Sequence, residues 1–453
     1  MAKLSEPTRI LVVGGGYVGM YTALRLQKKL ARKADITVVD PQSNMTYQPF
    51  LPEAAAGSLE PRHVVVPLRK VLRRCRVITA TVTRIEHARK VATVLPSEGE
   101  GYEVGYDLLV ACPGSISRLL PIPGLAEHGI GFKTIGEAIY LRNHVLSRLD
   151  LAASVPDAER RRRALSFVFV GGGYAGVEAI AELQDMARYA LRYVDGIDEA
   201  DMRWVLVEAA TRIMPEVSVA LAAYTADRLA ERNIDVRLST RLESVVDGHV
   251  VLSDGDEFEA ETVVWTAGVK ANPMLAATDL PQDDQGRLPC NADLTVRDID
   301  GVFAAGDCAA VPDLSRPDEP GAVCSPSAQH ALRQAKILAN NIVATIRGRA
   351  RHDYVHAYAG SVASLGLYRG VAEIYGIKLR GIIAWFMHRT YHVMRMPTFN
   401  RKVRVLADWT EALFFQREVV SLGQLQQPHT EFQQAAGLPP LPPGSPSNAE
   451  APT

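Results

Sequence analysis

The chain contains 453 residues, which is long for a single domain and predicts two or three domains. Hydrophobic residues make up 47% and charged residues 22% of it, as is usual for a folded protein with a large core. The formal net charge of −1 gives no sign of a nucleic-acid partner. No stretch of about 20 residues is apolar throughout, which argues against a transmembrane helix. The N-terminal sequence MAKLSEPTRI lacks the apolar core of a signal peptide, so we expect the chain to stay in the cytosol.

The first predicted element is a buried strand over residues 10–13 (ILVV), which a glycine-rich turn follows at once. The glycines stand at the G-x-G-x-x-G positions Gly14, Gly16 and Gly19. In such a turn the first glycine permits the tight bend, the second lets a pyrophosphate approach the backbone, and the third lets the next helix pack closely. A helix-like stretch then leads to the strand ITVVD, whose last residue, Asp40, is placed to bind ribose hydroxyls.

The same device recurs later in the chain. The apolar run FVFV at 167–170 precedes three glycines with the same spacing, which are Gly171, Gly173 and Gly176. A longer predicted helix follows and leads to the strand WVLVE, which ends in Glu208. An acid at this position favours NADH over NADPH, although Arg212 nearby could weaken that preference. Each turn could instead merely pack a helix on a sheet, but two complete copies predict two bound dinucleotides, a nicotinamide lying against a flavin.

The two copies differ at one informative position. When the glycines are aligned, Tyr21 of the first copy corresponds to Glu178 of the second. We expect Glu178 in the first turn of its helix, where the helix dipole favours an anion. The residues alone leave two interpretations open, a functional acid beside the bound dinucleotide or an ordinary charge at a helix terminus.

The five cysteines indicate neither a metal site nor a redox-active pair. They follow no metal-ligand spacing and form no CxxC motif. A structural disulfide is not expected in the cytosol. We therefore expect five buried, inert thiols at Cys75, Cys112, Cys290, Cys308 and Cys324.

Residues 376–417 combine large apolar side chains with a net positive charge, and we expect the following cations to face membrane headgroups: Lys378, Arg380, Arg389, Arg395, Arg401, Lys402, Arg404 and Arg417. Pro397 predicts a break between two helices. An apolar face of the first helix is expected from Ile382, Ile383, Trp385, Phe386, Tyr391 and Met394. A basic amphipathic pair of this kind fits a membrane interface, and a dimerisation face or a cap over the other domains stays open as the alternative. The sequence from Gly437 onwards is rich in proline and lacks the apolar content to pack, which predicts disorder.

Three further motifs carry a family resemblance. The segments VACPGS (110–115), TVVWTAGV (262–269) and GVFAAGDCAAV (301–311) resemble conserved stretches of two-dinucleotide-domain flavoproteins, in the usual order. Within that superfamily the chain is most similar to type II NADH:quinone oxidoreductases. The resemblance covers about residues 8–425 and rests on YQPFLPEAAAGSLEP at 47–61, WTAGV at 265–269, SPSAQHALRQ at 325–334 and the stretch that ends near Trp409.

The resemblance implies an α/β fold with two Rossmann-like domains and a C-terminal amphipathic helical region that binds membranes. The FAD domain would comprise residues 1–115 and 273–350, the inserted NADH domain 116–272, the membrane-associated region 351–430 and a disordered tail 431–453. Non-covalent FAD would be held by Gly14, Gly16, Gly19, Asp40, Gly114, Gly306 and Asp307, and NADH by Gly171, Gly173, Gly176, Glu208 and Gly268.

For catalysis the resemblance points to Glu178, beside the nicotinamide and quinone sites, and to Gln329 at the quinone tunnel. Gln329 could equally be an ordinary residue in the first turn of its helix. Arg333 replaces a glutamine of the family pattern, which leaves the electron acceptor open between menaquinone, ubiquinone and others. The expected protein is a peripheral enzyme on the cytoplasmic face of the membrane, with a homodimer possible.

Rival interpretations remain at this stage. The missing cysteine pair disfavours a disulfide reductase. A sulfide:quinone reductase needs cysteines placed to carry sulfur, and no such spacing is present. A ferredoxin-type reductase and a flavin-binding redox sensor without turnover stay open.

Overall fold

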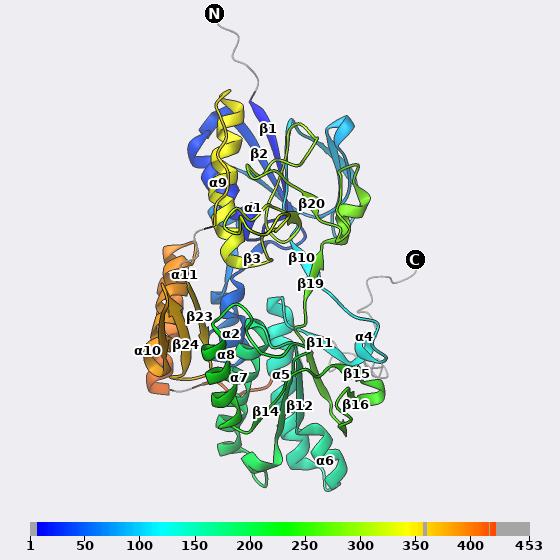
Figure 1. The fold of residues 1–453 in the computed structure, drawn as a ribbon, viewed down its shortest axis with the longest axis vertical. Coiled ribbons are helices and arrows are strands. Elements are labelled where there is room, and N and C mark those ends of the chain that lie inside the picture. Colours follow the sequence, from blue (N-terminus) through cyan, green and yellow to red (C-terminus); the bar gives the residue numbers. More distant parts are fainter. Residues whose placement is uncertain (1–6, 357–359, 416, 423–453) are drawn as a thin grey trace, which may run out of the picture.

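The computed structural model describes residues 7–356, 360–415 and 417–422. The predicted disordered tail, 431–453, lies outside them. The chain forms two α/β bodies, one above the other in Figure 1, and a smaller C-terminal unit that lies against their side. The mixed α/β class with Rossmann-like parallel sheets agrees with the expectation from the sequence.

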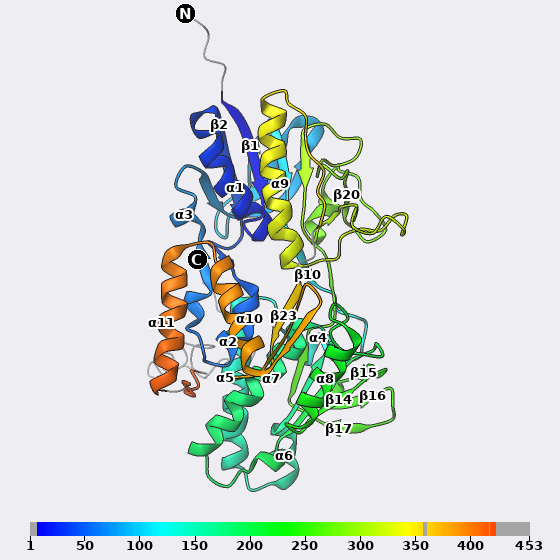
Figure 2. The same ribbon diagram turned by 60° about the vertical axis from the view of Figure 1, so that its left-hand side comes forward.

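The upper body is built on a five-stranded parallel sheet with the order β21-β9-β1-β2-β5. Its first strand, β1 (Thr8–Val13), is the predicted apolar run and is buried over its last four residues. The helices α1 (Tyr17–Lys29) and α9 (Ala328–Ile346) pack side by side against it (Figures 1 and 2). The other strands are β2 (Ala34–Asp40), β5 (Arg76–Thr79), β9 (Leu108–Ala111) and β21 (Val302–Ala304). Because β21 joins from far along the chain, two separate segments build this sheet.

The lower body repeats the plan with the parallel order β11-β18-β12-β13-β14. Its strands are β11 (Gly129–Gly131), β12 (Ser166–Val170), β13 (Arg203–Val207), β14 (Ile234–Arg237) and β18 (Thr262–Trp265). Its helices are α5 (Ile135–Ser154), α6 (Ala158–Ala164), α7 (Tyr174–Ala190) and α8 (Val219–Ala230). Trp204 on β13 stacks on Phe167 of β12 with ring centroids 4.3 Å apart, and this contact fixes the two strands at the centre of the core.

Smaller elements complete the two bodies. The antiparallel sheets are β3 (Asn44–Thr46) with β4 (Val65–Pro67), β6 (Thr81–Glu86) with β7 (Val91–Leu95) and β8 (Tyr102–Gly105), and β15 (Leu242–Ser244) with β16 (His249–Leu252) and β17 (Glu257–Glu259). The parallel pair is β20 (Leu288–Pro289) with β22 (Ala309–Ala310). Short helices are α2 (Leu51–Ala55), α3 (Leu68–Val71) and α4 (Leu125–His128).

Two antiparallel strands, β10 (Ser115–Ser117) and β19 (Val269–Ala271), join the two bodies. The chain passes down through β10, builds the lower body, and returns through β19, as the waist of Figure 1 shows. The two places where the chain passes between the upper and lower bodies therefore lie beside each other.

The C-terminal unit consists of a hairpin sheet and two helices. These are β23 (Gly360–Ser364), β24 (Gly370–Ile374), β25 (Ile377–Arg380), α10 (Gly381–Arg395) and α11 (Phe399–Phe415). The two helices part near Pro397 as predicted, but the segment from 376 opens on a strand rather than a helix. Trp385 was expected on an exposed face and is buried instead. Among the described residues, no helix combines the length and apolarity that a membrane crossing needs.

Candidate active site

The first glycine turn has the geometry of a phosphate cradle. Gly14 adopts φ +102°, and its amide donates to the carbonyl of Val39 at 2.8 Å. A Cβ on Gly19 would lie 1.8 Å from the carbonyl oxygen of Gly14, so only glycine lets α1 approach the strand this closely. A Cβ on Gly16 would meet no atom within 4 Å. The space beside Gly16 is therefore open for a ligand.

The second glycine turn has the same backbone geometry as the first. Gly171 adopts φ +115°, and a Cβ on Gly176 would lie 1.9 Å from the carbonyl oxygen of Gly171. A Cβ on Gly173 would again meet nothing within 4 Å. Both following helices begin without a side-chain cap and without an acidic residue in their first turn. Their uncapped amides and helix dipoles suit a pyrophosphate, so both cradles fit a dinucleotide.

The two predicted ribose-binding acids hold matching positions. Asp40 ends β2 and accepts a 2.6 Å hydrogen bond from the amide of Gly15, and Glu208 accepts one of the same length from the amide of Gly172. Burial raises the pKa of Asp40, and the amide of Gly15 partly offsets this rise. Each acid thus lies at the mouth of its own glycine turn. The guanidinium of Arg212 donates to the carbonyls of Pro215 and Val217.

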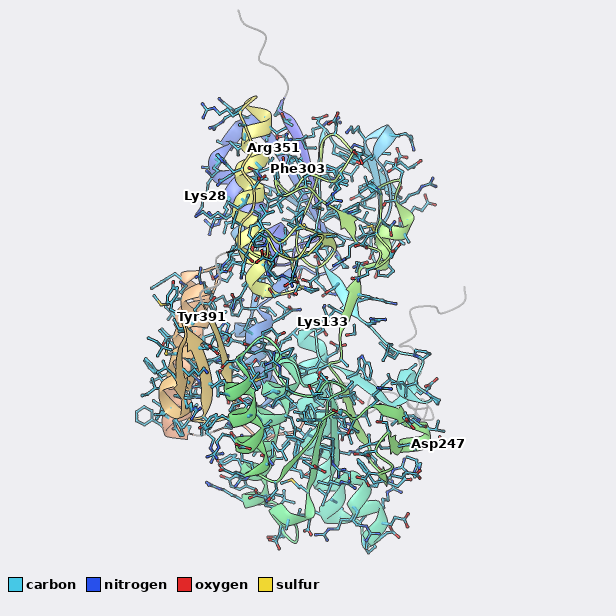
Figure 3. The ribbon with its side chains drawn as sticks, in the orientation of Figure 1. Lys28, Lys133, Asp247, Phe303, Arg351 and Tyr391 are labelled. Carbon is cyan, nitrogen blue, oxygen red and sulfur yellow. The ribbon has the colours of Figure 1, made fainter. Side chains whose placement is uncertain are left out.

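Asp307 lies where the two bodies meet. The hydroxyl of Ser115 donates to Asp307 at 2.6 Å, and the ammonium of Lys133 donates to that hydroxyl, also at 2.6 Å. Figure 3 places Lys133 at the waist of the molecule. Burial lowers the pKa of Lys133, and the charges of Asp307 and Glu137 oppose this. The sequence reasoning did not find Lys133, because a single lysine in a loop carries no motif.

The glycines of the three family motifs occupy turns at the same waist. Gly114 and Gly268 have φ of +72° and +84°, and a Cβ on either would meet no atom within 4 Å. Gly306 has φ +79°, and its amide donates to the side chain of Gln334 at 2.7 Å. Gln334 therefore positions the turn that ends in Asp307, which explains why a glutamine is buried there.

Glu178 and Gln329 are tied to opposite ends of a single strand. The amide of Ser364 donates to Glu178 at 2.8 Å, and the side-chain amide of Gln329 donates to the carbonyl of Gly360 at 3.2 Å. Because β23 runs from Gly360 to Ser364, its ends are roughly 13 Å apart at the usual rise per residue. The structure thus aligns the two predicted catalytic residues along one edge without bringing them into contact. Glu178 is the fifth residue of α7, one position beyond the first turn that we expected.

A group of buried charged side chains surrounds Glu178. We call it the buried charge cluster, and it consists of Glu53, Glu178, Glu182, His388, Arg389 and Arg417. Glu53 accepts a 2.7 Å hydrogen bond from the indole of Trp409. Arg389 lies 3.5 Å from Glu53 and stacks over the rings of Trp385 and Trp409. Together with Trp409, the cluster joins α2, α7, α10 and α11, so it docks the C-terminal unit on the helices α2 and α7.

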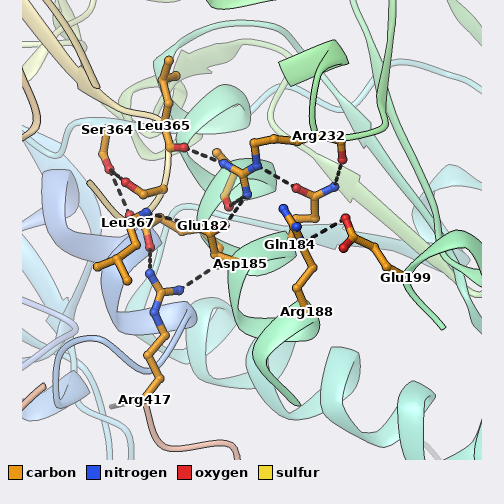
Figure 4. A network of polar contacts seen from close by, with 12 residues as sticks. Glu182, Gln184, Asp185, Arg188, Glu199, Arg232, Ser364, Leu365, Leu367 and Arg417 are labelled. Carbon is orange, nitrogen blue, oxygen red and sulfur yellow. Dashed lines mark hydrogen bonds and ion pairs between the residues drawn. The ribbon is translucent and has the colours of Figure 1, made fainter. Parts of the chain in front are cut away.

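Glu182 forms the other half of the cluster and is fully buried. It accepts hydrogen bonds of 2.9 Å from the hydroxyl of Ser364 and from the guanidinium of Arg417 (Figure 4). Burial alone would raise the pKa of Glu182, but the charges of Arg417 and Arg389 outweigh it and lower that pKa. Arg389 and Arg417 were expected among the cations facing membrane headgroups, and both are instead paired inside the protein.

A neighbouring network fixes the turn between β23 and β24. Arg232 pairs with Asp185 at 2.6 Å and donates to the carbonyl of Leu365, while the amide of Leu367 donates to Asp185 at 2.6 Å. Figure 4 shows these residues converging on α7 from the hairpin and from the end of α8. The hairpin that carries Gly360 and Ser364 is thereby held rigidly on α7.

The cysteines take no part in these networks. All five are free thiols, and Cys112, Cys290, Cys308 and Cys324 are buried. Cys75 is only half-buried, which corrects the expectation of five buried thiols. Burial raises the pKa of every one of them, to about 11 for Cys324 and about 12 for Cys75. Within the part of the chain that the structure describes, no group of three or more potential ligands could hold a metal ion.

Sequence reasoning missed Glu53 and His388 as members of the site. Glu53 lies in the quoted stretch YQPFLPEAAAGSLEP, where an acid within an apolar run was a usable signal. His388 carried none, since a histidine in a basic helix is expected to face water.

The comparisons with known proteins agree with this geometry. The model of the pyridine nucleotide-disulphide oxidoreductase family matches residues 8–335. The type II NADH:quinone oxidoreductase Ndh of Mycobacterium tuberculosis is 27% identical over 473 residues and covers 99% of both chains. A type II NADH:quinone oxidoreductase of Staphylococcus epidermidis is 30% identical over 84% of this chain and 93% of its own. The solved structure of NDH2 from Plasmodium falciparum with NADH has a TM-score of 0.84, at 18% identity, over 91% of this chain and 99% of that one.

Proposed function

Because the chain belongs to the pyridine nucleotide-disulphide oxidoreductase family, and within it to the type II NADH:quinone oxidoreductases, we propose that it transfers two electrons from NADH through FAD to a membrane quinone. The observation that carries the proposal is the pair of matched, uncapped glycine cradles, one on each parallel sheet. Two dinucleotide sites in one chain suit an enzyme that passes a hydride from a nicotinamide to a flavin. In the proposed reaction, electron transfer is not coupled to proton pumping.

In this proposal the first cradle holds non-covalent FAD and the second holds NADH. Gly14, Gly16 and Gly19 receive the FAD pyrophosphate, Asp40 its ribose, and Asp307 its ribityl region. The glycines of the second turn and Glu208 bind NADH in the same way. The FAD domain comprises 1–115 and 273–350, the NADH domain 116–272, and the membrane-associated region 351–430. The bound flavin supplies a two-electron acceptor, and the chain positions the two reactants and keeps water away from them.

Glu178 and Gln329 are the proposed catalytic residues. The overall reaction converts NADH, one proton and a quinone into NAD⁺ and a quinol. Glu178 accepts a hydrogen bond from the amide of Ser364 at the end of β23, so it is placed to hand over a proton. Gln329 is positioned by the other end of β23 and would hydrogen-bond the quinone head group. Menaquinone and ubiquinone both suit this arrangement.

The buried thiols count against the sulfur-handling rivals. A sulfide:quinone or disulfide reductase needs a reactive thiolate, and burial raises the pKa of every cysteine in this chain. The apolar α10–α11 surface suits a lipid-soluble acceptor better than a ferredoxin-type protein partner.

Anaerobic spectroscopy of the purified protein tests the proposal. The protein should be yellow, should bleach when NADH is added, and should regain its colour with a soluble quinone. Bleaching that only an electron-carrier protein reverses would support a ferredoxin-type reductase. A protein that holds flavin but never bleaches would support a redox sensor. Comparing NADH with NADPH, and several quinones, then identifies the substrates.

We further propose that the enzyme lies on the cytoplasmic face of the membrane through the C-terminal helices. Eight large apolar side chains on α10 and α11 are at least 60% exposed, and they are Ile382, Ile383, Phe386, Met394, Phe399, Leu413, Phe414 and Phe415. Lys378, Arg380, Arg395 and Lys402 supply positive charge along the same segment. Exposed apolar side chains beside basic ones are typical of a helix that lies in the headgroup region. A homodimer that buries this face is the competing outcome.

A further inference from the structure

His388 is a fully buried histidine that lies between carboxylates of two different helices. Its Nε2 is 3.2 Å from Oε1 of Glu178, which belongs to α7 of the lower body. Its Nδ1 is 4.0 Å from Oε1 of Glu53, which belongs to α2. The side chain of His388 is 1% exposed, as is that of Glu53. Oε1 of Glu53 and both ring nitrogens of His388 lack a hydrogen-bond partner among the described residues, so the 3.2 Å approach of Nε2 to Glu178 is an ion-pair contact.

The charges that face His388 do not balance without an extra proton. Three carboxylates of the buried charge cluster, on α2 and α7, meet only two guanidinium groups, those of Arg389 and Arg417. Asp185 and Arg232 neutralise each other nearby. An uncompensated buried charge is strongly unfavourable, so the cluster favours taking up one proton. His388 lies between two of the three carboxylates and is the titratable base closest to both.

Burial also raises the pKa of Glu53, and His388 is the base that lies between Glu53 and Glu178. Burial lowers the pKa of His388, but the contact with Glu178 and the charges of Glu178 and Glu53 outweigh burial and raise that pKa above its ordinary value. His392 lies one turn further along α10, with its ring 4.6 Å from that of His388. Burial and the charge of His388 hold the pKa of His392 far below its ordinary value, so His392 stays neutral.

We propose that His388 stores the proton that quinone reduction consumes and passes it through Glu178 to the quinone oxygen. This inference rests on the proposed function, because reduction of a quinone by NADH takes one proton from the medium. The N–H bond of His388 breaks as an O–H bond forms on Glu178. The O–H bond of Glu178 then breaks as the quinone, reduced by the electron pair from NADH, gains its proton. His388 recovers a proton from solvent. His388 is thus a positioning residue that acts through Glu178.

Histidine-labelled holoenzyme tests the proton sharing without turnover. In an NMR titration, the ring signal that is missing from His388→Gln should titrate above pH 6.5. Glu53→Gln removes the excess negative charge on the far side of the ring from Glu178, so it should lower this pKa by about 1 unit or more. A histidine that serves only as packing would not respond to Glu53→Gln. A ring signal that stays neutral throughout, or one that Glu53→Gln leaves unchanged, would overturn the inference.

Stopped-flow kinetics test the delivery step. Reoxidation of the reduced wild-type enzyme by a soluble quinone should slow as the pH rises through the pKa of His388. His388→Gln should reoxidise about 100-fold more slowly at low pH, the lower end of the usual contribution of a positioned proton donor, and should lose this pH dependence. Its bleaching by NADH should match the wild type. The control His392→Gln removes the neighbouring ring on the same helix and should keep the wild-type pH profile.

The outcomes separate the two proposals. A wild-type enzyme that no quinone reoxidises at any pH would overturn the proposed function and proton delivery together. Reoxidation by quinone with a pH profile that His388→Gln leaves intact would overturn the role of His388 alone.

Discussion

Arg417 and Glu182 are 235 residues apart in the sequence and form a 2.9 Å ion pair between buried side chains. Arg417→Met would leave the Glu182 carboxylate buried with the hydroxyl of Ser364 as its main remaining donor. Breaking a buried pair on one side costs about 3–5 kcal/mol, so we expect a loss of that size in the free energy of unfolding, measured by urea denaturation. Arg188 pairs with Glu199 at the same distance, but both side chains are more than a third exposed. Arg188→Met should therefore cost at most about 1 kcal/mol, and equal losses in the two variants would contradict the structure.

The open space beside Gly16 and Gly173 predicts that binding of each cofactor can be weakened without affecting the other. Gly173→Ala places its methyl group where no protein atom lies within 4 Å, so the fold should be unaffected while the pyrophosphate is blocked. The purified variant should stay yellow and require at least about tenfold more NADH for bleaching, a loss of about 1.4 kcal/mol or more. The matched variant Gly16→Ala should instead lose flavin.

Gly19→Ala is the structural contrast to these two variants. Its methyl group would lie 1.8 Å from a backbone oxygen, so it should lower the melting temperature of the apoprotein as well. If Gly16→Ala lowered the melting temperature of the apoprotein equally, this result would contradict the open space that the structure shows beside Gly16.

Glu208 should control the choice between NADH and NADPH. Its carboxylate is fixed by the amides of Gly172 and Ala210 at 2.6 and 2.7 Å, and a phosphate on the adjacent ribose would meet this negative charge. Steady-state kcat/KM should favour NADH in the wild type. Glu208→Gln should reduce the preference by about tenfold or more, largely by loss of repulsion. Arg212→Gln should change it little, since that guanidinium is engaged with carbonyl groups, and a strong effect of Arg212→Gln would refute this arrangement.

Much of the fold could be predicted from the sequence, because its signals are local. Each strand, glycine turn and terminal acid occupies one continuous stretch, and Gly14 and Gly171 can be recognised without knowing their neighbours. Membership of the buried charge cluster could not be predicted in this way. Arg389 and Arg417 looked like surface cations because their partners, Glu53 and Glu182, lie hundreds of residues earlier. The burial of Trp385 was missed for the same reason, since periodicity within one helix does not reveal which face another element covers.

The stability of the protein should depend on pH through His388. Its folded-state pKa is raised above 6.5, so the stabilisation it provides is complete below pH 6.5 and is lost as the pH rises through the folded-state value. The melting temperature of wild type minus that of His388→Gln should therefore be largest near pH 6 and shrink toward pH 9. The pKa of Glu182 is lowered in the folded protein, so the stabilisation that Glu182 provides is present above its ordinary pKa of 4.5 and is lost as the pH falls further. Glu182 therefore does not contribute to the change between pH 6 and pH 9. A difference that grows with pH would contradict the protonated state of His388.

The exposed face of the C-terminal helices should decide binding to vesicles. Phe386 is 65% exposed, and its transfer from water to lipid is worth about 1.5–3 kcal/mol. Phe386→Glu should thus reduce flotation with anionic vesicles by at least about tenfold. Val219→Glu is the control, because Val219 is 70% exposed on α8 of the lower body and should not touch lipid. Unchanged flotation of Phe386→Glu together with a shift from dimer to monomer would identify the face as a subunit interface.

Because the strands β10 and β19 pair with each other, the lower body is an insertion whose two ends lie side by side. Because its entrance and exit lie side by side, the segment between them can be exchanged for another dinucleotide-binding unit without lengthening the path of the chain outside it. A chimaera joined at these strands would take its reductant from the donor unit, and that unit would also have to supply Glu178, which lies on α7 between the two strands. The same two cut points offer a natural place to open the chain for circular permutation.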